Sequence, residues 1–191
     1  MRGVAPQPHP VLDSVIETLD SAGYEAAIPA LSELLVDAVE GGASVNFLAG
    51  VTNEQAAAWW AERIPLVADG TITAFVATEP GTGRLLGSTI LVRSRNPNAP
   101  HRAEVGKVIV RRSARRRGLG RALMEAAESR ARADGRWLLV LDTEAGTAAE
   151  ALYRSMGWHV LGTMPNHAYK SNGALAPTTY FWKDLREHDG P

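Results

Sequence analysis

The stretch from Glu104 to Met124, EVGKVIVRRSARRRGLGRALM, most constrains how this chain can fold. It begins with valines and an isoleucine that favour a buried β-strand ending at Val110. After a basic turn, Gly118-Leu119-Gly120 opens a segment whose apolar residues recur at the i, i+3, i+4, i+7 spacing of one helical face. The sequence therefore predicts a strand, a basic turn, glycines and a helix in direct succession.

This succession leaves backbone N–H groups free at a helix N-terminus, which carries partial positive charge and binds phosphate. Gly118 and Gly120 have no Cβ, so an anion can approach the main chain closely. The turn is not a Walker A loop, because Gly-Lys-Ser/Thr occurs nowhere in the chain. It is not a dinucleotide fingerprint either, because Leu123 stands where that motif requires Gly or Ala. We therefore predict a diphosphate site of another kind.

Six arginines lie between Arg111 and Arg121. They suit nucleic acid, a solvated turn or the phosphates of a coenzyme. The formal net charge of the chain is only −1, so no overall positive field attracts a polyanion. We favour coenzyme phosphates, contacted by only some of the arginines, and expect no nucleic-acid partner.

The composition is that of one ordinary globular domain. We expect a loose tail at residues 1–10, the domain at residues 11–186 and a C-terminal tail at residues 187–191 of the 191. The chain has no cysteine, and its five histidines are scattered, so we expect no metal site and no cysteine nucleophile. No run is apolar enough for a membrane span or a signal peptide, so we expect a cytoplasmic protein without membrane association.

Hydrophobic spacing and turn residues predict an α/β protein with a mixed sheet rather than a doubly wound one. Residues 165–173 are expected to form a polar loop. The other expected elements are a strand at 11–19, helices at 23–39 and 52–68, strands at 71–78, 85–95 and 101–110, a helix at 118–133, a strand at 137–141, a helix at 147–156, and strands at 158–163 and 178–185.

Two segments resemble motifs of one known family. Arg115-Arg116-Arg117-Gly118-Leu119-Gly120 fits Arg/Gln-x-x-Gly-x-Gly/Ala directly after a strand, which resembles motif A of the GCN5-related N-acetyltransferases (GNAT). In that family the motif holds the pyrophosphate of acetyl-coenzyme A. Leu141-Asp142-Thr143 and the later ALYRSMGW segment resemble motif B. The combination is similar to the subgroup that contains the tabtoxin-resistance acetyltransferase.

The resemblance covers about residues 11–185 and implies a single-domain acyl-CoA N-acyltransferase (GNAT) fold, with a mixed, mostly antiparallel central sheet flanked by helices. It implies acetyl-CoA as co-substrate and no metal. Backbone groups of the strand are then expected to pair with the pantetheine amides like an added strand. The coenzyme-binding residues that it implies are Val108, Ile109, Val110, Arg115, Arg116, Arg117, Gly118, Leu119, Gly120 and Arg121.

Acetyl transfer to an amine requires a neutral nucleophile, yet an amine of pKa about 10 is neutral in roughly one molecule per thousand at pH 7. The resemblance offers Glu104 and Asp142 as general bases, and the sequence does not decide between them. A surface ion pair and a turn cap are their alternative roles. Tyr153 is the candidate that hydrogen-bonds the departing thiolate, with a core aromatic as its alternative.

The acyl acceptor is expected between Phe47, one of two paired tryptophans and the loop around Tyr169; of the pair we choose Trp60. Beside Tyr169, His167 and Lys170 are expected to bind an acceptor carboxylate. The favoured function is acetylation of the primary amine of a small molecule, either amino-acid-like or an amine-bearing antibiotic or toxin. A protein or peptide N-acetyltransferase and a non-catalytic acyl-CoA-binding domain remain alternatives. The sequence leaves the oligomeric state open, with a homodimer as the default.

Overall fold

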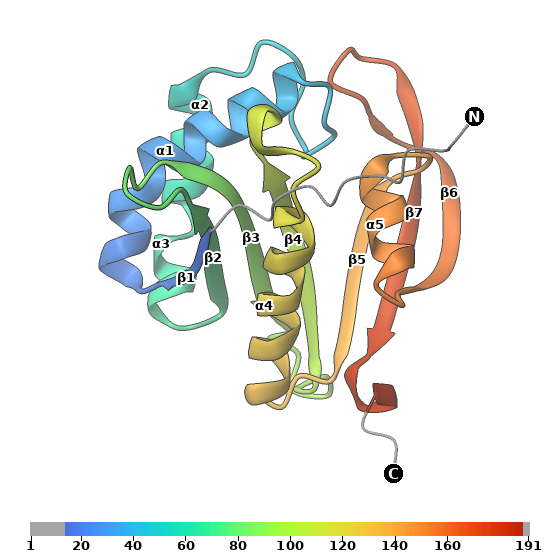
Figure 1. Ribbon diagram of the computed structural model, residues 1–191. Helices are drawn as coiled ribbons and strands as arrows, with labels where there is room; N and C mark the ends of the chain where they lie inside the picture. The colour runs from blue at the N-terminus through green and yellow to red at the C-terminus, as the bar shows by residue number, and fades with distance from the viewer. Residues whose placement is uncertain (1–13, 189–191) are drawn as a thin grey trace, which may run out of the picture.

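The computed structural model describes residues 14–188, which form a seven-stranded sheet with helices on both faces (Figure 1). The strand order is β1-β2-β3-β4-β5-β7-β6. Every neighbouring pair is antiparallel except β4 and β5, which are parallel. The predicted mixed, mostly antiparallel sheet is therefore confirmed. The expected tail at residues 1–10 and the last three residues of the expected tail at 187–191 lie outside the described range.

Within residues 14–188, each expected strand and helix has a counterpart, with shifted ends. The strands are β1 (Val15–Leu19), β2 (Ile72–Thr78), β3 (Leu85–Arg93), β4 (Arg102–Val110), β5 (Leu138–Glu144), β6 (His159–Tyr169) and β7 (Leu175–Asp184). The helices are α1 (Ser21–Glu40), α2 (Asn53–Ala61), α3 (Ile64–Ala68), α4 (Leu119–Ala133) and α5 (Ala148–Ser155), with 3₁₀ turns η1 (Arg112–Ala114) and η2 (Leu185–His188).

Side-chain caps fix where the helices begin. α2 begins with a capping box, because the side chains of Thr52 and Gln55 each accept the backbone N–H of the other residue. At α5, the Thr147 hydroxyl accepts the N–H of Glu150 at 3.4 Å. α1 starts at Ser21, earlier than expected, because Asp20 accepts the N–H of Gly23 at 2.7 Å.

Two predicted elements were wrong. The expected helix at 52–68 is broken into α2 and α3, with Pro65 in the first turn of α3, where a missing N–H costs nothing. The expected polar loop at 165–173 is largely strand, since β6 continues to Tyr169 and pairs there with Leu175. A register shift between Met164 and Ala168 accommodates Pro165, which has no N–H to donate.

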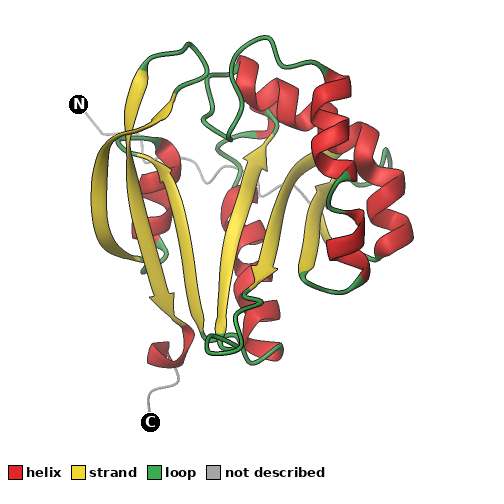
Figure 2. Cartoon of the chain, turned by 180° about the vertical axis from the view of Figure 1, so that it is seen from behind, coloured by secondary structure: helices red, strands yellow, loops and turns green. Residues whose placement is uncertain are grey.

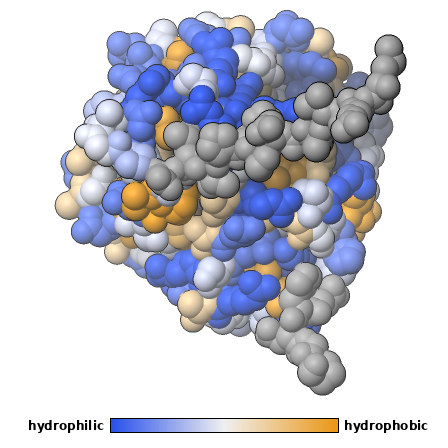
Figure 3. Space-filling view, in the orientation of Figure 1, coloured by the Kyte–Doolittle hydropathy of each residue, from blue (hydrophilic) through white to orange (hydrophobic). Residues whose placement is uncertain are grey.

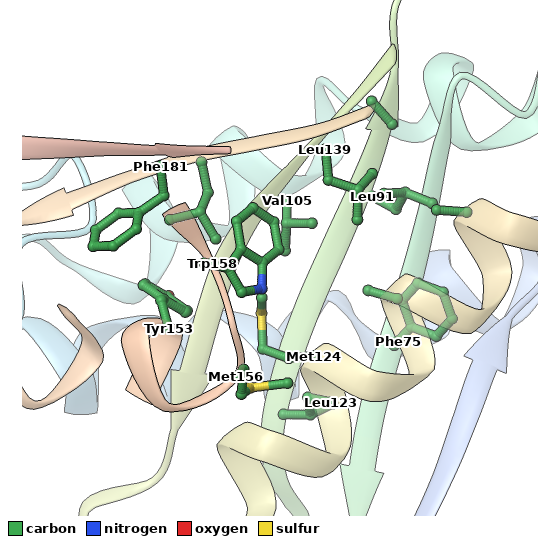
Figure 4. Close-up of a cluster of buried hydrophobic side chains, with 14 of the residues drawn as sticks. Phe75, Leu91, Val105, Leu123, Met124, Leu139, Tyr153, Met156, Trp158 and Phe181 are labelled. Carbon is green, nitrogen blue, oxygen red and sulfur yellow. The ribbon is translucent and has the colours of Figure 1, made fainter. Parts of the chain in front are cut away.

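Hydrophobic cores lie on the two faces of the sheet. On one face, α4 and α5 cover a cluster in which Tyr153, Trp158 and Phe181 lie close together (Figure 4). On the other face, α1, α2 and α3 cover the strands from β1 to β4. Figure 2 shows that no helix among residues 14–188 covers β5, β7 and β6 on this second face. The boundary between its covered and bare parts runs along β4 and β5.

Candidate active site

β4 and β5 pair only near their first residues and then separate (Figure 1). The last paired residues are Glu104 and Val140, although β4 continues to Val110. The β4 edge beyond Glu104 therefore has backbone N–H and C=O groups without a strand partner on this side, and these can pair with an extended ligand. The region between the separated parts of β4 and β5 is called the cleft below. Ile109 is 3% exposed, so mainly its backbone can reach the cleft.

A bulge lies where β4 leaves β5. Lys107 and Val108 together lie opposite the single residue Thr89 of β3. Lys107 takes the left-handed conformation with φ of 51°, and the Ser88 hydroxyl donates to its carbonyl at 3.4 Å. A bulge bends its strand and re-aims a side chain, which accounts for the divergence of β4 from β5.

α4 begins beside this cleft with an uncapped N-terminus. Its N-cap is Gly118, which has φ of 81° and offers no side-chain hydrogen bond to the first N–H groups. A Cβ at Gly118 would meet no atom within 4 Å, so the approach to these N–H groups is open. Leu119 contributes mainly its backbone, because its side chain is 3% exposed. This geometry suits a bound anion.

Gly120 serves a different purpose from the one we expected. A Cβ there would lie 3.2 Å from Cδ2 of Leu152. That contact is tighter than ordinary van der Waals packing, so the glycine allows α4 and α5 to approach closely. The expectation that a missing Cβ opens the main chain to an anion does not hold at Gly120, because position 120 faces α5.

The arginines of the basic turn divide into two groups. Arg116 and Arg117 are exposed and make no hydrogen bond or ion pair with other residues in the range 14–188, so they are available to an anion. Figure 3 shows hydrophilic side chains gathered at the upper end of the molecule, where the β4–α4 turn lies in Figure 1. The arginines that bond to protein groups are Arg111 to Leu85, Arg112 to Asp37 and Glu40, Arg115 to Val110, and Arg121 to Ser155.

Glu104 and Asp142 lie on the same face of the sheet. Glu104 pairs with Val140, and Asp142 follows Val140 by two residues on β5. Because successive side chains of a strand point to opposite faces of the sheet, both carboxylates lie on the face that α2 borders. Partial burial, and then the negative charge of Asp142, raise the pKa of the Glu104 carboxyl above its ordinary value. A raised pKa moves a general base closer to the working pH.

Lys107 is a site residue that the sequence analysis missed. Its Nζ lies 4.5 Å from the centroid of the Trp59 ring, and the charges of Asp142 and Glu104 act on it. Burial and, after it, the positive charge of the neighbouring Arg63 guanidinium lower the pKa of Lys107 to about 8. The sequence hint to Lys107 was a charged residue in the middle of a valine-rich strand. The bulge that directs its side chain into the cleft cannot be recognised from the sequence.

The choice of Trp60 as a pocket wall was wrong. Trp60 has no exposed surface and packs in the core under α1, where the Tyr24 hydroxyl donates to its carbonyl at 3.0 Å. Trp59 is the partly exposed member of the pair, with its ring centroid 6.1 Å from that of Phe47. Adjacent helical positions differ in direction by about 100°, so one tryptophan faces the core and the other the cleft.

The β6–β7 hairpin lies beside the loop between α1 and α2. The Ala49 N–H donates to the Ser171 carbonyl at 2.7 Å, and Tyr169 of this hairpin is 59% exposed. Lys170 is neutralised by Glu144 at 2.8 Å, so it is not the free cation that we expected. The ring of His167, the other expected carboxylate ligand, is in hydrogen-bonding distance of the Tyr180 hydroxyl at 3.1 Å.

Tyr153 lies at the edge of the core. Its side chain is buried against Trp158 and Phe181, and burial together with the charge of Asp142 raises its pKa above the ordinary value (Figure 4). The phenol therefore stays protonated across the physiological range. Its hydroxyl makes no hydrogen bond within residues 14–188, so it is free to donate one to a ligand.

No helix between residues 14 and 188 is long and apolar enough to cross a membrane. No group of three or more histidine, aspartate and glutamate side chains in that range is arranged to hold a metal ion.

Residues 33–158 match the model of the acetyltransferase (GNAT) family. Among solved structures, yncA of Salmonella typhimurium, solved with its cofactor acetyl-CoA, is 25% identical, with a TM-score of 0.71 over 94% of this chain and 98% of that one. Ribosomal-protein-alanine N-acetyltransferase of Brucella melitensis is 27% identical, with a TM-score of 0.70 over 90% and 99%. A phosphinothricin acetyltransferase of Sinorhizobium meliloti shares the fold, with 18% identity and a TM-score of 0.75 over 93% and 92%.

Proposed function

We propose that this chain, which belongs to the acetyltransferase (GNAT) family, acetylates the primary amine of a small molecule. It is an N-acyltransferase, and acetyl-CoA is its acyl donor. The acceptor that we propose is amino-acid-like or an amine-bearing antibiotic or toxin. Placement in the tabtoxin-resistance subgroup is part of this proposal, supported by the Leu141-Asp142-Thr143 segment on β5.

The observation that carries the choice of a small acceptor is the hydrogen bond between Ala49 and Ser171. It joins the α1–α2 loop to the β6–β7 hairpin at the end of the molecule toward which β4 and β5 diverge (Figure 2). An extended peptide crossing the cleft there has to break this contact, whereas a small amine can bind with it intact.

The residues of the cleft fit acetyl-CoA. The uncapped N–H groups of α4 and the open space at Gly118 suit a pyrophosphate, with Arg116 and Arg117 as additional cations. The unpaired edge from Val108 to Val110 suits the pantetheine amides. When bound, the coenzyme supplies a thioester whose acetyl group reacts with the amine.

The chain's own side chains then handle the protons. Glu104 accepts a proton from the ammonium form of the acceptor, and Asp142 helps to keep its pKa raised for this task. Tyr153 donates a hydrogen bond to the sulfur as negative charge develops there. Its pKa is too high for complete proton transfer to be the favoured description.

A peptide acceptor is the second candidate, and the likeness to the Brucella melitensis enzyme favours it. The test is a screen that measures thiol release from acetyl-CoA with small primary amines, amino acids and peptides that begin with alanine. We expect turnover with small amines or amino acids and little with the peptides. Turnover of the peptides alone would overturn the small-molecule assignment.

A further inference from the structure

Two cations share one aromatic ring at the border of the cleft. Cζ of Arg63 lies 3.2 Å from the centroid of the Trp59 ring, and Nζ of Lys107 lies 4.5 Å from it. Trp59 and Arg63 are one helical turn apart in the α2–α3 region, whereas Lys107 comes from the bulge in β4. The fold therefore brings together two like charges from distant parts of the sequence.

Neither cation has a strong counter-ion in the described part of the chain. The ammonium group of Lys107 makes no hydrogen bond and no ion pair there, although the residue is partly buried. The guanidinium of Arg63 donates to the carbonyl of Trp59, and its ion pair with Glu62 spans 3.7 Å to a carboxylate that is 75% exposed. An exposed pair of that length contributes little. The site thus lacks an anion.

The pKa values agree with this geometry. Burial lowers the pKa of Lys107 and of Arg63, and the positive charge of Arg63 further disfavours the protonated form of Lys107. An anion bound between the two side chains would reduce this repulsion and offset the free-energy cost of desolvating the two cations.

The missing anion belongs at the acceptor end of the cleft. The diphosphate site is at the start of α4, after β4 has ended, whereas Lys107 lies where β4 leaves β5. The charges of Glu104 and Asp142, which suit an ammonium group, act on Lys107 without forming an ion pair with it. Positive and negative groups thus face the same space without neutralising each other.

We propose that Arg63 and Lys107, held on the face of Trp59, form a subsite for a carboxylate of the acceptor, while Glu104 and Asp142 receive its amine. This inference rests on the proposed function and names the class of its substrate, a zwitterionic amino acid with a free carboxylate. It replaces the expected pair of His167 and Lys170, because Lys170 is already neutralised by Glu144. The two cations then face the carboxylate of the substrate, and the two carboxylates face its ammonium group.

The test compares amino acids with their carboxamides, which keep the amine and the size but lose the negative charge. Thiol release is measured for the wild type, Lys107→Met, Arg63→Gln and Lys170→Met. We expect Lys107→Met and Arg63→Gln to raise KM for the amino acid by about tenfold or more, the usual consequence of losing a charge-assisted contact. Turnover of the carboxamide should change much less, and its persistence shows that the variant is folded.

Three outcomes would overturn the subsite. The first is an equal loss of turnover of the amino acid and of its carboxamide in Lys107→Met and Arg63→Gln. The second is a wild type that shows no preference for the amino acid over the carboxamide. The third is a loss of this preference in Lys170→Met alone. Isothermal titration of acetyl-CoA into Lys107→Met and Arg63→Gln should give wild-type affinity, and weaker binding would assign these cations to the coenzyme. If neither acids nor amides release thiol in the wild type, the small-molecule function itself fails, which is a separate result.

Discussion

The ammonium of Lys183 on β7 lies 2.7 Å from a carboxylate oxygen of Glu128 on α4, and both side chains are less than 8% exposed. The second oxygen of Glu128 accepts the indole N–H of Trp158 at 2.9 Å. Lys183 also donates to the carbonyl of Met156 at 2.8 Å. This buried network fixes α4, whose first turn is the proposed diphosphate site, to β7 and to the end of α5.

Removing either member of this ion pair should destabilise the protein strongly. Glu128→Gln and Lys183→Met each leave a buried polar partner uncompensated, at a cost of about 3–5 kcal/mol. Urea denaturation measures the loss. The double variant Glu128→Leu/Lys183→Met should recover much of it, because no unpaired charge then remains. Single variants within 1 kcal/mol of the wild type would contradict a structural role for the pair.

Coenzyme binding should be sensitive to charge at position 118. Asn and Asp both tolerate the left-handed backbone better than other residues, so Gly118→Asn and Gly118→Asp form a matched pair. Only Asp places a negative charge in the open space before α4. Calorimetry with acetyl-CoA should show at least tenfold weaker binding for Asp than for Asn, with a smaller difference at high salt. Equal affinities would place the diphosphate elsewhere.

Tyr153→Phe should lower kcat by about a hundredfold, the scale seen when one donor to developing negative charge is lost. KM for acetyl-CoA should change little, because the ring remains in its place between Trp158 and Phe181. The wild-type rate should not fall from phenol ionisation as the pH rises toward 10, since burial holds the pKa of Tyr153 above its ordinary value. An unchanged kcat in Tyr153→Phe would remove the hydroxyl from the mechanism.

The pH profile separates the two carboxylates. A general base must be ionised, so kcat/KM is lost as the pH falls through its pKa. Asp142 raises the pKa of Glu104, so Asp142→Asn should move the acidic limb to lower pH while the limb persists. Glu104→Gln should abolish this limb. The reverse pattern, with the limb lost in Asp142→Asn and only shifted in Glu104→Gln, would make Asp142 the base.

Local sequence signals predicted much of the fold. The capping residue Thr52 marked the start of α2, and the glycines after the basic turn marked the start of α4. These signals work because caps and left-handed turns depend on a few adjacent residues. The extension of β6 was missed because Pro165 is typical of a loop, and only pairing with β7 makes that segment a strand.

The site divides in the same way. The sequence by itself determined the left-handed turn at Gly118, which we propose binds the diphosphate, because backbone φ, a missing side chain and a helix start depend on neighbouring residues. Only the tertiary structure decided that Trp59 rather than Trp60 borders the cleft, and that a bulge brings Lys107 to it. These outcomes depend on how α2 packs on the sheet and on one extra residue of β4 opposite β3. The burial of a side chain and its distance from other charges depend on residues that are distant in sequence, so no local sequence pattern predicts them.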